Sequence, residues 1–170
     1  MKFISTMRAT GGGDAPEDVQ GGLNQALKNM LWTEGSIKQL FLICDAPGHG
    51  KDICDSSDNH PKGSPDGYRI QVQMQEFAKR RINFNIVRVN SSVDKMIDVM
   101  RANYDSIDRK IIVTDLQKSV STKTHAEVTK EFVAATSYIL SVAVGGTAHK
   151  KVAKKVASDP LWESKKFEVG

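Results

Sequence analysis

The chain has 170 residues, enough for one domain with a hydrophobic core of its own. Its net charge of +4 is mild and its basic residues are spread over most of the chain, so we expect no nucleic-acid partner. No apolar run approaches the roughly 20 residues of a membrane span, and no signal peptide is visible, so we expect no transmembrane segment. Because Cys44 and Cys54 are the only cysteines, the composition favours a reducing compartment such as the cytoplasm.

Strand-like and helix-like segments alternate along the first part of the chain. "KFISTM", at residues 2–7, is a short possible strand that ends at a run of glycines. Asp14 and Glu17 have the spacing of a capping box, so a helix is predicted to begin there and to run over residues 14–31. Its predicted apolar face consists of Val19, Leu23, Ala26, Leu27, Met30 and Leu31. Residues 37–45, "IKQLFLICD", are continuously apolar, which is typical of a strand covered on both faces in a parallel sheet.

The same alternation continues to residue 146. Helices are predicted at 68–81, 91–104 and 124–146, and strands at 84–89 and 110–116. The apolar positions expected in the core are Ile70, Met74, Phe77, Ala78, Val93, Met96, Ile97, Met100, Tyr104, Val128, Phe132, Ala135, Ile139 and Val142. This order predicts an α/β domain with a mostly parallel sheet over residues 1–146, followed by a basic tail or linker over 147–170.

The carboxyl ends of the predicted strands are where ligands bind in such sheets. Asp45, Asn90 and Asp115 stand there and are candidate floor residues. The stretch "LFLICDAPGHGK" also invites a phosphate-loop interpretation. In a Walker loop, however, Asp45 would replace the first glycine and Asp52 the final hydroxyl residue, so we expect no binding of ATP or GTP. The Asp-x-Pro-Gly-His segment of translational GTPases is excluded because the chain lacks the accompanying motifs.

Two polar segments remain. The loop at 50–68 and its flank contain His49, Cys54, Asp55, Asp58 and His60, but their spacing matches no common zinc pattern, so a solvated loop is predicted. The tail segment "HKKVAKKVA" is predicted to be a solvated helix end, with contact to an acidic membrane surface as the weaker alternative.

Three segments, "ATGGGDAPEDVQGGLNQAL", "LFLICDAPGHGK" and "VNSSVDKMIDVM", resemble the von Willebrand factor type A domains found next to alpha-type protein kinase domains. The resemblance runs from about residue 3 to residue 116. It implies a three-layer, doubly wound, mostly parallel sheet with a metal-ion-dependent adhesion site. Asp14 and Asp45 would be the acids that hold Mg²⁺ there, and carboxylates are the hard donors that Mg²⁺ prefers. Alternatively, Asp14 is only a helix cap and Asp45 only ends a strand.

The family's first metal-binding loop, Asp-x-Ser-x-Ser, does not occur in this sequence. We therefore expect a domain that is incomplete at its amino terminus, with Mg²⁺ binding that is weak or lost. The strand that ends at Asp45 would then have an exposed apolar edge, unless residues 2–7 cover it.

The resemblance implies a non-catalytic module that binds a protein partner through the cation, within an alpha-kinase-like protein. No catalytic residues can be assigned from the sequence, so the chain by itself is not expected to be an enzyme. The alternatives are a regulatory fragment of an alpha-type serine/threonine protein kinase and, less favoured, a nucleotide-binding α/β domain.

Overall fold

A computed structural model of the chain describes residues 6, 8 and 12–144. Of the strand predicted at 2–7, only Thr6 is among them, and it is helical. The predicted tail at 147–170 lies outside the described residues. No helix among the described residues is long and apolar enough to cross a membrane.

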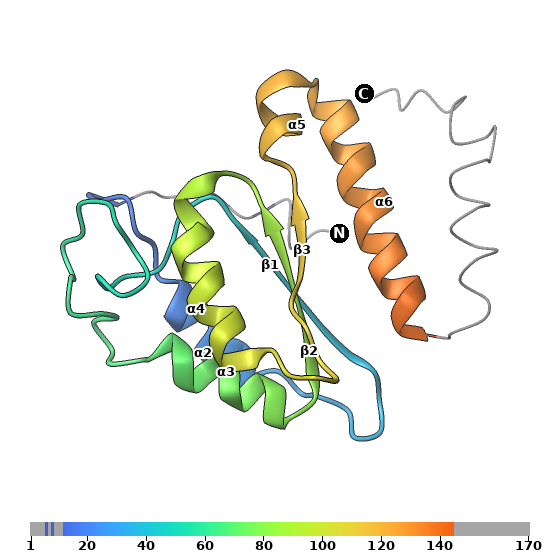
Figure 1. Cartoon of the computed structure of the whole chain (residues 1–170), viewed down its shortest axis with the longest axis horizontal. Helices are drawn as coiled ribbons and strands as arrows, with labels where there is room; N and C mark the ends of the chain where they lie inside the picture. Colours follow the sequence, from blue (N-terminus) through green and yellow to red (C-terminus); the bar gives the residue numbers. More distant parts are fainter. Residues whose placement is uncertain (1–5, 7, 9–11, 145–170) are drawn as a thin grey trace.

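The sheet has three strands, all parallel, in the order β1-β2-β3 (Figure 1). The strands are β1 (Lys38–Cys44), β2 (Ile82–Arg88) and β3 (Ile112–Asp115). In the register, Phe41, Asn85 and Ile112 lie side by side. The predicted parallel sheet is confirmed, and its three strands end beside Asp45, Asn90 and Asp115 as expected.

Helices lie on both sides of this sheet (Figure 1). One side carries α2 (Val19–Lys28), α3 (Ile70–Lys79) and α4 (Asp94–Tyr104), the last preceded by the 3-10 turn η1 (Ser91–Val93). After β3 the chain forms α5 (Gln117–Thr122) and then α6 (His125–Val144), which lies on the other side.

The core lies between the sheet and the side that carries α3 and α4. The predicted apolar faces of these two helices are confirmed, because Met74, Met96 and Met100 have no exposed surface. The Phe84 ring packs edge-on against Phe77, with ring centroids 5.2 Å apart. Each such buried aromatic contributes several kcal/mol by apolar burial, on the order of 3–5 kcal/mol by truncation.

The predicted start of the first helix is wrong. The helix begins at Val19, and its N-cap is Asp18, whose side chain accepts a hydrogen bond from Gly21 N at 2.9 Å. Asp14 therefore caps no helix, and Glu17 is not part of a capping box. Glu17 is extended instead: it forms a parallel bridge with Gly48, just beyond the end of β1.

The predicted end of that helix is also wrong. The helix ends at Lys28, so Met30 and Leu31, which were expected on its apolar face, lie outside it. They are 58% and 99% exposed, whereas Leu23 and Leu27 are buried.

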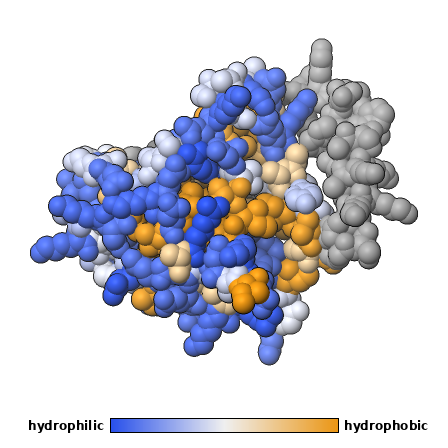
Figure 2. Space-filling view, viewed as in Figure 1, coloured by the Kyte–Doolittle hydropathy of each residue, from blue (hydrophilic) through white to orange (hydrophobic). Residues whose placement is uncertain are grey.

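The described residues cover the second face of the sheet only in part. Ile43 and Ile112 are 57% and 44% exposed, and Ile139 is the buried residue of α6. Figure 2 shows apolar side chains gathered over the strands and alongside α6. The predicted helix therefore forms as α6, but most of its predicted apolar face is half-buried or exposed.

Candidate functional site

The segment between β1 and α3 is a folded loop, and the prediction of a solvated loop is wrong for its interior. His49, Ile53, Cys54 and Ser64 are all buried. Gly50 makes the fold possible, with a φ of +120° that other residues avoid. A Cβ at Gly50 would lie 2.6 Å from Asp52 Oδ1 and 3.2 Å from the Cα of Gly63.

Within the described residues, the loop brings together one group that could hold a metal ion: Asp14, His49 and Asp58. One ligand atom from each lies within 4.8 Å of the other two. His49 Nδ1 is 2.8 Å from Asp58 Oδ1 and 3.9 Å from Asp14 Oδ2. Asp14 comes from the segment before α2, so the group joins two parts of the chain that are distant in sequence.

Asp58 is the most enclosed of the three, with a side chain that is 3% exposed. Burial by itself raises the pKa of this carboxyl, but hydrogen bonds from Gly50 N, His49 and His60 N outweigh it. The pKa of Asp58 is therefore below its usual value, and the group is a carboxylate at neutral pH.

Asp14 is held less tightly. Its Oδ2 accepts a hydrogen bond from Asn59 N at 2.7 Å, and no donor to Oδ1 is found within the described part of the chain. Its side chain is 14% exposed. Asp14 therefore keeps an oxygen that could bind a cation.

Asp45 lies apart from this group. It is exposed at the end of β1, and its carbonyl oxygen accepts hydrogen bonds from Asn90 Nδ2 at 2.6 Å and Ser92 Oγ at 2.8 Å. These bonds fix its backbone and leave its carboxylate facing solvent. The structure joins Asp14 to His49 and Asp58, and the pairing of Asp14 with Asp45 stays a prediction.

Asp115, the third candidate floor residue, forms an ion pair with Arg88. Arg88 Nη1 donates to Asp115 Oδ2 at 3.0 Å, while its Nε and Nη2 donate to Asp94. The hydrogen bond to Asp94 is the largest of the effects that raise the pKa of the Arg88 guanidinium further. At this corner of the sheet edge, one arginine therefore offsets part of the charge of two carboxylates.

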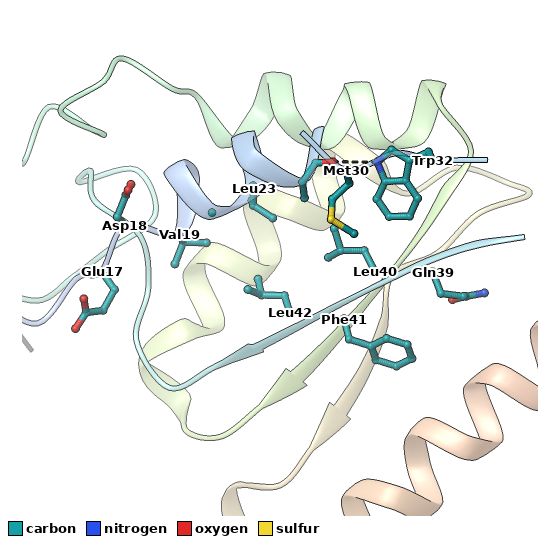
Figure 3. A pocket seen from close by; sticks show the side chains of 12 residues that line it. Glu17, Asp18, Val19, Leu23, Met30, Trp32, Gln39, Leu40, Phe41 and Leu42 are labelled. Carbon is teal, nitrogen blue, oxygen red and sulfur yellow. Dashed lines mark hydrogen bonds between the residues drawn. The ribbon is translucent and has the colours of Figure 1, made fainter. Parts of the chain in front are cut away.

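A groove of about 550 Å³ runs between β1 and α2 (Figure 3). Leu40 and Leu42 point into it from the strand, and Phe41 points to the opposite face of the sheet. Trp32 closes one end, with Nε1 donating to Ala26 O at 2.9 Å. Among the described strands, β1 pairs only with β2, so its other edge has no strand partner.

Fold and site together define an α/β domain with a parallel sheet, an Asp-His-Asp group and an apolar groove beside an edge strand. No protein family model matches the sequence, and no solved structure gives a significant match. Among curated proteins, the alpha-protein kinase vwkA of Dictyostelium discoideum is 33% identical over 110 residues. The match covers 64% of this chain but 17% of the kinase, so the chain corresponds to a small part of that protein.

Sequence reasoning missed the Asp-His-Asp group because its members have no regular spacing. A signal was nevertheless present. The segment from residue 47 to 67 carries Pro47, Gly48, Gly50, Pro61, Gly63 and Gly67, and this density of turn residues is typical of a compact folded loop.

Proposed function

We propose that this chain is a non-catalytic protein-binding module of von Willebrand A type, belonging to an alpha-kinase-like protein. The similarity to vwkA supports the association with a kinase. The parallel order of the strands and the Gly-Gly-Gly-Asp and Asp-Ala-Pro segments support the type of module.

The edge of β1 that has no strand partner among the described residues is the observation that carries the binding role. An edge strand offers unpaired backbone N–H and C=O groups, to which an extended segment of a partner can add as a further strand. The groove supplies apolar contacts beside that edge, from residues such as Val19, Leu23 and Leu40. An extended, apolar partner segment would therefore gain backbone hydrogen bonds and apolar burial at once.

In the proposed module, Asp45 is a ligand of the cation. Its exposed carboxylate, with Asp14, would hold Mg²⁺ at the carboxyl edge of the sheet, and an acidic side chain of the partner would complete the coordination. Two carboxylates without hydroxyl ligands leave most positions to water, so Mg²⁺ binding by the chain alone is weak.

The thiols support a non-catalytic role. Both cysteines are buried, and burial, with a smaller effect of the Asp45 charge, raises the pKa of Cys44 to about 11. A protonated, enclosed thiol is a poor nucleophile.

The second candidate function is a regulatory fragment of an alpha-type serine/threonine protein kinase, which the identity of the relative favours. A phosphotransfer assay with Mg²⁺ and ATP tests whether the chain itself has kinase activity. We expect no phosphate incorporation by the purified chain into itself or into a generic protein substrate, and sustained incorporation would favour the kinase assignment.

Photo-crosslinking tests the binding role. Benzoylphenylalanine in place of Phe41 puts the crosslinker on the edge strand while keeping an aromatic ring there, and the same residue in place of the exposed Lys79 on α3 is the matched control. In cells that express the protein, we expect adducts from position 41 that are lost when Leu42→Glu is added. Equal adducts at positions 41 and 79, or none at position 41, would contradict the proposal.

A further inference from the structure

We propose that Asp14, His49 and Asp58 form a Zn²⁺ site with one open coordination position. This site shares one ligand with the proposed Mg²⁺ pair but differs from it in the others, and it would exist whether or not a partner binds at β1. Asp14 belongs to both, whereas His49 belongs to the zinc site and Asp45 to the magnesium pair.

The geometry fits a transition metal. Ligands at about 2.0–2.2 Å from Zn²⁺ in a tetrahedral arrangement lie roughly 3.3–3.5 Å from one another. The observed separations from His49 Nδ1 are 2.8 Å to Asp58 and 3.9 Å to Asp14, which bracket that value. Small side-chain rotations would equalise the distances, and the proton between His49 Nδ1 and Asp58 would be released to solvent as the metal binds.

The electrostatics favour a cation at this point. Asp14 and Asp58 are two carboxylates with side chains 14% and 3% exposed, and their ligand oxygens lie within 4.8 Å of each other. Like charges held this close and largely out of water repel, and a divalent ion between them relieves the repulsion. Asp14 has an oxygen without a hydrogen-bond donor in the described residues, so it can turn to the ion at little cost.

The donor set selects the metal. An imidazole nitrogen with two carboxylates suits Zn²⁺ and its transition-metal neighbours, whereas Mg²⁺ prefers oxygen donors and keeps much of its water. Three protein ligands leave the fourth tetrahedral position for water or an incoming carboxylate. Around the ligands, Asp58 is oriented by the N–H groups of Gly50 and His60, an arrangement typical of the supporting shell of a metal site.

The test is calorimetric titration of the purified, metal-free full chain with ZnCl₂ and, separately, with MgCl₂. Absorption of bound Co²⁺ reports the coordination geometry. The informative variants are Asp14→Asn, which still accepts from Asn59 N, and His49→Gln. The control is Asp45→Asn, and circular dichroism checks that each variant folds.

We expect one Zn²⁺ per chain and a tetrahedral Co²⁺ spectrum. Asp14→Asn and His49→Gln should each weaken Zn²⁺ binding by about tenfold or more, because loss of even an outer-shell partner costs 10–100-fold. Asp45→Asn should leave it unchanged.

Two results would overturn the proposal: no Zn²⁺ binding by the folded chain, or Zn²⁺ binding that both folded variants retain. The proposed Mg²⁺ pair is judged separately, by Mg²⁺ titration of a chain extended at its amino end with Asp-x-Ser-x-Ser and of the Asp45→Ala variant of that extended chain, because this chain alone is expected to bind Mg²⁺ weakly. The binding role at β1 is judged by crosslinking alone.

Discussion

Arg88 and Asp94 form a bidentate ion pair, in which Nε and Nη2 of Arg88 donate to the two carboxylate oxygens of Asp94 at 2.5 and 2.9 Å. The pair ties the end of the central strand β2 to the first turn of α4, and the same guanidinium reaches Asp115 at the end of β3. One side chain thus joins three elements at the edge of the sheet where ligands of such folds bind.

We predict that Arg88→Ala lowers the free energy of unfolding by only about 1 kcal/mol. Both acidic partners are more than half exposed, so solvent screens most of the Coulomb energy. Urea denaturation measures the change, and Arg88→Lys, which keeps the charge but not the forked geometry, should recover part of it. A loss that does not shrink in 1 M NaCl would show that the arginine acts by packing and not by charge.

Asp58→Asn is predicted to lower stability at pH 7 by about 1–3 kcal/mol, because it removes the charge that accepts three hydrogen bonds. The pKa of Asp58 is lowered in the folded chain, against about 3.9 when unfolded. At pH values between the folded and the unfolded pKa of Asp58, the unfolded state binds more protons than the folded state. The stabilisation by the Asp58 charge is therefore present above the unfolded pKa and is lost as the pH falls through the folded pKa.

Unfolding by urea at a series of pH values from 7 down to 3 measures the effect of Asp58→Asn. The stability difference from the parent chain should shrink as the solution becomes more acidic than about pH 4. Asp66→Asn, at an exposed position of the same loop, is the control and should have no effect. A difference that is constant over the whole range would mean that the charge of Asp58 contributes nothing.

We predict that Cys44 reacts slowly with thiol reagents at pH 8 in the folded chain. Its pKa is about 11 because of burial and, less, the Asp45 charge, so little thiolate is present. Alkylation followed by peptide mass spectrometry identifies the modified residue, and the guanidinium-unfolded chain gives the reference rate. Labelling of Cys44 at the reference rate would show that the thiol is not enclosed.

No binding of ATP or GTP is expected. Asp52 stands where a Walker loop needs a hydroxyl, and in the structure its carboxylate accepts a hydrogen bond from Gln71 at 2.6 Å. The Lys51 side chain is exposed, and no phosphate-wrapping glycine precedes it at the required spacing. Calorimetry should give no heat of binding. Micromolar affinity that disappears with Lys51→Ala would contradict this.

Periodicity predicted much of the fold. Met96, Met100 and Tyr104 recur at helical spacing because one face of α4 packs on the sheet, and a helix that buries a face must repeat apolar residues in this way. The continuous apolar run of β1 led to the correct prediction of a parallel strand, but its second face is only partly covered, with Ile43 57% exposed.

Local rules failed where a tertiary contact competed with them. Asp14 and Glu17 have the spacing of a capping box, but Glu17 N donates to Pro47 O at 2.9 Å, which holds that segment extended. The helix therefore starts at the next available cap, Asp18. The contact between His49 and Asp58 could not be predicted from the sequence either, because it depends on how a whole loop folds and not on a periodic pattern.

Magnesium titration tests the proposed cation-dependent module most directly. Calorimetry compares this chain, a chain extended at its amino end by a strand-forming segment with Asp-x-Ser-x-Ser, and the extended chain with Asp45→Ala. We predict weak or undetectable Mg²⁺ binding by this chain, clear binding by the extended chain, and loss of that binding with Asp45→Ala. Tight Mg²⁺ binding by this chain, or binding by the extended chain that Asp45→Ala leaves unchanged, would contradict the assignment.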